Sequence, residues 1–217
     1  MRWMALAGLS LAFAAPLRAE DIVDVLRRSQ QQRLEALRPA VGERAATVRQ
    51  SFERLRTLLR VEAPLDLIVV SGAIVAETFH GRRVVANESL AELPEGERLF
   101  ILAHEIGHVQ AAHWAQLGRL YQRWVPGEVV PEKTDPVAAP LGREASALSH
   151  RQEFEADIFA LEALHQLQRP ASDAYALFMR QGLQFDTATH PGTRKRIAWL
   201  RAAEATRESA PSGSDAE

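Results

Sequence analysis

A helical repeat of apolar side chains runs through residues 21–60. Apolar positions recur there at intervals of three and four, which is the spacing of one helix face. They are Leu34, Leu37, Val41, Ala45, Val48, Phe52, Leu55 and Leu59. Because Pro39 suits the first turn of a helix better than its interior, the pattern predicts two consecutive helices that break near Arg38. The stripe is expected to pack against the core of the domain rather than to bind a partner helix.

Between residues 65 and 86 the pattern changes to short runs of β-favouring side chains. The runs cover residues 67–70, 74–79 and 83–86, with Ser71-Gly72 and His80-Gly81 between them as turns. The pattern therefore predicts a sheet of about three strands. A sheet of this size is too small to be stable alone, so we expect it to pack on helices.

From residue 95 onward the pattern is again helical. Residues 95–116 are mostly apolar on all sides, which is typical of a buried helix. Four prolines and two glycines between residues 125 and 142 predict a long loop. Further helices are expected at residues 146–167, at residues 172–183, and after Pro191 up to residue 205. The whole pattern predicts an α+β fold, predominantly α-helical, with the small sheet packed on the helix of residues 95–116.

The two ends of the chain differ from the part between them. Arg2, an apolar stretch at residues 4–15 and a small residue before Glu20 predict a signal peptide of residues 1–19, cleaved after Ala19. The alternatives are an uncleaved anchor or a buried N-terminal helix. No later segment approaches the ~20 apolar residues that a membrane span needs. We expect a single domain at residues 20–207 and a polar, disordered tail at residues 208–217.

Composition narrows the possible partners and metal ligands. The chain has 217 residues, of which 47% are hydrophobic and 25% charged, and a formal net charge of -2. This charge indicates neither nucleic acid nor an anionic membrane surface as a partner, and no feature specifies an oligomeric state. There is no cysteine, which excludes disulfides and thiolate metal sites. Any metal must be held by His, Asp or Glu.

The strongest chemical signal is the segment His104-Glu105-Ile106-Gly107-His108 within the predicted buried helix. Two histidines four residues apart project from one helix face, so His104 and His108 can hold one metal ion. Glu105 lies at the flank of that face, where a general base can reach a water molecule. In apolar surroundings these polar groups would be costly to bury without a metal. The segment predicts one Zn²⁺ per chain, and Gly107 predicts close packing of another backbone segment beside it.

A catalytic zinc site needs a third protein ligand. The motif HExxHxxGxxH would supply it from the same helix, but Ala111 and Trp114 stand where that motif has glycine and histidine. His113 lies one residue short of the required position, and we expect it to be a polar residue at the end of the helix. The third ligand must therefore come from another segment.

The segment Ser149-His-Arg-Gln-Glu-Phe-Glu-Ala-Asp157, after the HEIGH motif, resembles the peptidase family of CAAX prenyl proteases, HtpX-like heat-shock proteases and periplasmic BepA-like proteases, a gluzincin group. The resemblance implies a zincin-like domain with Glu153 as the third zinc ligand. The spacing agrees, since Glu153 and Asp157 share one helix face and Asp157 could support a ligand histidine. Alternatively, both carboxylates face solvent. Glu155 points elsewhere and is expected at the surface.

A third match to this family is the segment from Thr189 to Ile197, which contains His190, Pro191 and Arg196. In relatives the corresponding histidine lies near the zinc, where it helps to bind the oxyanion or caps the metal in a resting form. The resemblance thus implies catalytic roles for His190 and Arg196, because a donor there would stabilise charge in the transition state. The alternative is that His190 is only a helix-entry residue before proline.

Together these features predict a zinc metalloendopeptidase in the form of a minimal catalytic domain. Its expected location is the periplasm or another exported compartment, and its expected substrates are unfolded or misassembled envelope proteins. The substrate is expected to lie extended along a sheet edge near residues 73–79. The loop at 125–142 could gate the cleft or be an uninvolved surface loop. Competing hypotheses are a zinc-binding but proteolytically silent chaperone or adaptor, and a metal-free helix bundle.

Overall fold

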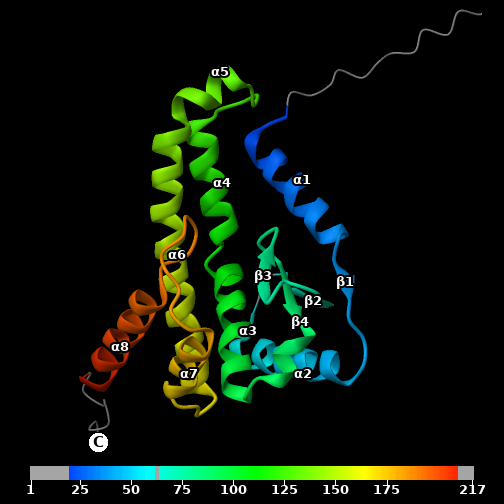
Figure 1. Cartoon of the computed structure of the whole chain (residues 1–217), viewed down its shortest axis with the longest axis vertical. Helices are drawn as coiled ribbons and strands as arrows, with labels where there is room; N and C mark the ends of the chain where they lie inside the picture. Colours follow the sequence, from blue (N-terminus) through cyan, green and yellow to red (C-terminus); the bar gives the residue numbers. More distant parts are fainter. Residues whose placement is uncertain (1–19, 62–63, 210–217) are drawn as a thin grey trace, which may run out of the picture.

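The computed structural model describes residues 20–61 and 64–209, and the predicted signal peptide and residues 210–217 lie outside this part of the chain. The helices are α1 (Ile22–Glu35), α2 (Glu43–Leu59), α3 (Glu95–Gln110), α4 (His113–Trp124), α5 (Pro131–Thr134), α6 (Ala138–Gln166), α7 (Ser172–Gln181) and α8 (Thr193–Ser209), with 3₁₀ turns η1 (Glu88–Glu92) and η2 (Asp135–Val137). The strands are β1 (Arg38–Pro39), β2 (Asp66–Ser71), β3 (Ala76–Phe79) and β4 (Arg83–Asn87). Helices dominate and a small mixed sheet accompanies them, which confirms the predicted fold class (Figure 1).

The sheet has the strand order β1-β2-β4-β3, so β3 forms one of its edges. β2 and β4 are parallel, and β3 and β4 form an antiparallel hairpin in which Ala76 faces Ala86. The three predicted strands are present, and β1 is a fourth that the pattern missed. Pro39 pairs with Val70 in this strand, so its predicted place in the first turn of a helix was wrong. A proline has no N–H to donate, which an edge strand tolerates.

Helix α2 carries most of the predicted apolar stripe. Ala45, Val48, Phe52 and Leu55 are buried in the main core, as expected. Val41 was wrongly assigned to this stripe, because it is 84% exposed. It lies between β1 and the start of α2, where the helical period does not apply. The first two residues of the stripe, Leu34 and Leu37, pack instead on a second cluster of buried side chains, those of Val70, Phe79 and Val85.

Helix α3 is the central element of the fold. Almost every residue from Gly96 to Val109 is buried, and the helix packs on α2, α6, α7 and β3. The predicted helix of residues 95–116 is in fact two helices, because Ala112 adopts a left-handed conformation (φ 52°) between α3 and α4. Alanine rarely adopts that conformation, so no local signal marks the break.

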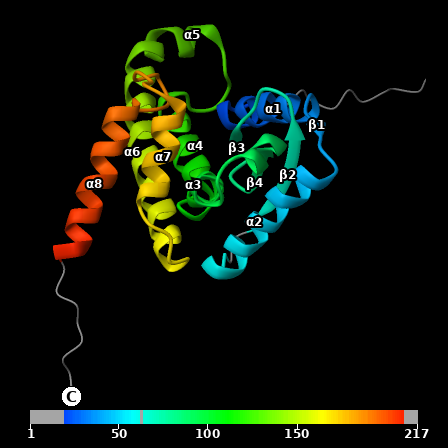
Figure 2. The same ribbon diagram turned by 60° about the horizontal axis from the view of Figure 1, so that its bottom comes forward.

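Helix α6 begins earlier than the sequence pattern predicts. The segment 125–142, expected to be one long loop, contains α5, η2 and the first turn of α6. Pro131, Pro136 and Pro140 all lie in the first turn of one of these elements, where a missing N–H breaks no hydrogen bond. Helices α4 and α6 run side by side, with α5 at their far end (Figures 1 and 2).

None of the described helices combines the length and the apolar character required to cross a membrane. At the C-terminal end of the described residues, α8 continues to Ser209 and so includes the first two residues of the predicted tail.

The corrected position of Val41 can be tested against a buried member of the same stripe. Leu55→Ala is expected to lower the free energy of unfolding by about 2–5 kcal/mol, because Leu55 is fully buried and its truncation leaves a cavity. Val41→Ala is expected to change it by less than about 0.5 kcal/mol. Urea denaturation followed by circular dichroism measures both, and equal losses would contradict the observed packing.

Candidate metal centre and active site

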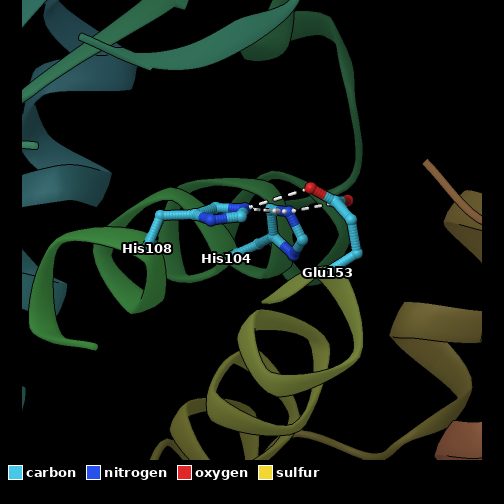
Figure 3. A group of neighbouring side chains, drawn as sticks. All are labelled: His104, His108 and Glu153. Carbon is cyan, nitrogen blue, oxygen red and sulfur yellow. Dashed lines mark hydrogen bonds and ion pairs between the residues drawn. The ribbon is translucent and has the colours of Figure 1, made fainter. Parts of the chain in front are cut away.

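Helices α3 and α6 bring three predicted ligands to one point. His104 and His108 project from α3, and Glu153 reaches them from α6 (Figure 3). The two Nε2 atoms are 3.1 Å apart. Glu153 Oε1 lies 3.3 Å from His108 Nε2, and Glu153 Oε2 lies 3.5 Å from His104 Nε2. The three side chains can therefore hold one metal ion.

The spacing and chemistry of this group fit zinc. Ligand atoms about 2.0–2.1 Å from a tetrahedral zinc ion are about 3.3–3.4 Å from one another, close to the separations found here. Glu153 Oε2 is buried and has no hydrogen-bond partner among the described residues, which is costly unless a cation compensates it. Two imidazoles and one carboxylate leave the fourth position open, as in catalytic zinc sites.

The charges around the ligands also favour a cation. Burial alone would raise the pKa of Glu153, but hydrogen bonds with His104 and His108 hold this pKa well below its ordinary value. Burial alone would lower the pKa of His104, but Asp157 and Glu153 raise it to about 10. Glu153 and Asp157 thus stabilise positive charge at this buried point, where Arg196 offsets part of their negative charge.

His104 is oriented by Asp157 and Arg196, both predicted from the sequence. Asp157 is fully buried, and its Oδ1 accepts a hydrogen bond from His104 Nδ1 at 3.0 Å, which leaves Nε2 available for the metal. Arg196 Nε donates to Asp157 Oδ2 at 2.7 Å, and Arg196 Nη1 lies 3.4 Å from Glu153 Oε2. Burial would raise the pKa of Asp157, but Arg196 lowers it. Arg196 therefore has the contacts of a positioning residue, and its catalytic role stays a prediction.

His108 is oriented by His113, which was not expected to be part of the site. His113 is buried at the start of α4, and its Nδ1 lies 2.8 Å from His108 Nδ1. Burial and the neighbouring His108 lower the pKa of His113, which favours its neutral form, and a neutral His113 can accept a hydrogen bond from His108 Nδ1–H. Its Nε2 faces Glu155 Oε2 at 3.3 Å. The expectation that His113 is only a polar residue at a helix end was wrong, because the turn at Ala112 directs it back to the site.

Glu105 lies beside the ligands and is held by the sheet. Its carboxylate is buried, and its Oε2 accepts a hydrogen bond from Thr78 Oγ1 at 2.8 Å. Thr78 belongs to the edge strand β3, so the predicted base and the sheet edge are directly linked. Thr78 was not predicted from the sequence, because a threonine in a short strand carries no chemical signal of its own.

His190 stands at the rim of the site, on the loop between α7 and α8. Its Nε2 is 3.7 Å from Glu153 Oε1, and its side chain is 59% exposed. Thr187 fixes its backbone, because Thr187 N donates to His190 O and His190 N donates to Thr187 Oγ1. His190 is near the ligands but outside the group that can share one metal ion. Its proposed contact with a reaction intermediate stays a prediction.

Gly107, one position before His108, allows the close packing expected of it. A Cβ at this position would lie 3.1–3.2 Å from the side chain of Phe159 on α6. The group that packs against Gly107 is therefore the side chain of Phe159 and not the backbone segment that was expected. α3 and α6 can therefore approach each other closely beside the metal ligands.

Two cavities meet at the metal centre, and His104, Glu105, Glu153 and His190 line both. The smaller, about 180 Å³, has a mixed wall in which the polar Gln181 and Arg196 accompany the apolar side chains of Val75, Ala76, Phe100, Ile101, Leu177 and Phe178. The larger, about 450 Å³, extends past Thr78 and Trp114 to Gln30 and Arg33 of α1. The two cavities form a cleft on both sides of Glu105.

Two helices that present a His-His-Glu group, with a glutamate held beside it next to a sheet edge, have the arrangement that is typical of zincin-type metalloproteases. The chain belongs to peptidase family M48, a family of zinc metalloproteases, whose model matches residues 43–204. This finding confirms the resemblance seen in the motifs.

The fold is also similar to a solved structure, that of Ste24p from S. mikatae. The TM-score is 0.50 at 19% sequence identity, and the match covers 81% of this chain and 55% of that one. The chain thus spans about half the length of this neighbour, and the similarity concerns the fold. No curated protein gives a significant match to the sequence.

The role of His113 can be tested by zinc binding. His113→Ala is expected to weaken zinc affinity by about 10–100-fold, because His108 loses the group that orients its ring. Glu162→Ala on the same helix as Glu153 is the control and should have a much smaller effect, since Glu162 is 53% exposed and lines neither cavity of the site. Titration against a competing chelator measures both variants. Unchanged affinity in His113→Ala would show that the contact does not support the ligand.

Proposed function

We propose that this protein is a zinc endopeptidase that cleaves extended segments of unfolded or misassembled proteins in an exported compartment. The observation that carries the proposal is the hydrogen bond from Thr78 to Glu105. This contact supports the proposal, because Thr78 of the sheet edge, Glu105 as the proposed base and the three proposed metal ligands all line one cleft. Family membership supports the chemistry, and residues 1–19, with the features of a signal peptide, support the location.

Each residue of the cleft has its own proposed role in peptide hydrolysis. His104, His108 and Glu153 would hold the zinc ion, which in such a site acts as a Lewis acid and lowers the pKa of water to about 7. Glu105 is positioned to take a proton from the attacking water and then to give it to the leaving amine. Thr78 keeps the Glu105 carboxylate in one orientation. His190, at the rim, can donate a hydrogen bond to the oxygen that gains negative charge.

The outer edge of β3 suits an extended substrate. Asn87 N donates to Val75 O at 2.8 Å, so Val75, Glu77 and Phe79 direct their backbone groups toward β4. Ala76 and Thr78 alternate with them and direct their N–H and C=O groups away from β4, toward the cleft. A polypeptide strand that pairs with these groups would lie next to Glu105. Backbone pairing depends little on sequence, which suits unfolded substrates.

The test is a single substitution at Glu105. Glu105→Gln is expected to keep stoichiometric zinc and to lower cleavage of unfolded casein by about 10²–10⁴-fold, because the amide cannot accept the proton. Glu53→Gln on α2 is a matched control at an exposed position and should behave as the native protein does. Metal analysis and a timed digest measure the two properties. If Glu105→Gln cleaved casein at the native rate, the silent chaperone or adaptor would be the better explanation.

The proposed location has its own test. When the full chain is expressed in a Gram-negative host, the mature protein should be recovered from the periplasm with Glu20 as its first residue, since cleavage is expected after Ala19. Cell fractionation and N-terminal sequencing measure this. An intact N-terminus in the membrane fraction would favour the uncleaved anchor instead.

A further inference from the structure

Helix α1 lies outside the segment that matches the family, yet it forms part of the cleft. The family model begins at residue 43, whereas α1 covers Ile22–Glu35. Gln30 and Arg33 of α1 line the same cavity as His108 and Glu105. In the two views of the fold, α1 lies near the β3 end of the sheet (Figures 1 and 2). α1 therefore contributes to the cleft from outside the matched segment.

Gln30 occupies the position that follows Thr78 along the open edge of the sheet. The next backbone N–H that turns away from β4 belongs to His80, and it donates to Gln30 Oε1 at 2.7 Å. His80 Nε2 also lies 3.1 Å from Arg27 O. On the other side of the hairpin turn, Trp114 of α4 packs so closely that a Cβ on Gly81 would lie 2.8 Å from it. A strand paired with Ala76 and Thr78 would meet α1 directly beyond Thr78.

α1 is fastened to the sheet by an ion pair and by partly buried apolar side chains. Arg33 donates to both oxygens of Glu77 in β3, at 2.8 and 2.5 Å, and its guanidinium lies 5.2 Å from the centre of the Phe79 ring. Leu34 packs on the cluster that contains Phe79, and Ile22 packs on the cluster that contains Leu120, but no residue of α1 is fully buried. Because its contacts are only partly buried, α1 can detach at a lower free energy than the helices of the main core.

We propose that α1 is a stop at one end of the substrate-binding edge, so that it limits how many substrate residues can bind beyond Thr78. The inference rests on the proposed function, since it assumes a polypeptide on β3. Antiparallel pairing is the more stable geometry, and a substrate in that orientation directs its N-terminal part toward α1. Gln30 and the Arg33–Glu77 pair are then specificity-determining residues that restrict the length of chain before the scissile bond.

The experiment compares the single variants Arg33→Glu and Glu77→Arg with the double variant that carries both substitutions, each in the zinc-loaded full chain. Hydrogen exchange of residues 22–35 reports detachment of α1. In each single variant, hydrogen exchange of this segment should be roughly two- to fivefold faster than in the native protein. The double variant should restore the native rate, because it restores an exposed ion pair. Arg54→Glu is the control, since it breaks a similarly exposed pair with Glu95 outside the cleft.

The same variants are assayed with peptides lengthened one residue at a time at the N-terminus. In the native protein, affinity and kcat/KM should stop rising once the peptide reaches α1. In the single variants they should continue to rise, by roughly two- to fivefold for the longest peptides. Affinity is measured by fluorescence anisotropy in a Glu105→Gln background, so it needs no hydrolysis.

Two results would overturn the proposal. One is faster exchange of α1 with the same dependence on peptide length as in the native protein. The other is unchanged exchange in both single variants, which would show that Arg33 and Glu77 do not hold the helix. Length-dependent binding without any cleavage would instead support α1 as a stop and contradict only the endopeptidase activity.

Discussion

The packing of α3 against α6 is the constraint on which the site depends. His104 and His108 lie on one helix and Glu153 on the other, so a metal can be shared only while the two helices stay at one distance and rotation. Gly107 allows this close approach, because Phe159 occupies the space where a side chain would be. Ligands on two packed helices are held more accurately than ligands on loops, which suits a centre that must keep one position open.

Around this pair of helices, polar side chains orient the two ligand histidines. Arg196 of α8 holds Asp157, which orients His104, and His113 of α4 orients His108. These contacts direct both Nε2 atoms to the same point and leave a buried negative charge there for a cation. The site is therefore a product of four helices, although only two of them carry the ligands.

The sheet is small, but its edge position gives it a direct part in the site. Thr78 holds Glu105 with its side chain while its backbone faces the cleft, so the base and the binding edge cannot move independently. The same edge ends where α1 meets His80. One short strand thus links the proposed base, the proposed substrate-binding edge and the proposed limit at α1.

The sequence alone determined which site residues share one face of the same helix. Helical spacing predicted the shared face of His104 and His108 with Glu105 at its flank, and the pairing of Glu153 with Asp157, since residues four apart lie on one side of a helix. Glu153 itself was assigned as a ligand through the resemblance of its motif.

Only the tertiary structure revealed the roles of His113 and Thr78, the strand at Arg38–Pro39 and the exposure of Val41. Each depends on how separate elements meet or where a helix starts. Local periodicity cannot report these relations, because packing between distant segments sets them.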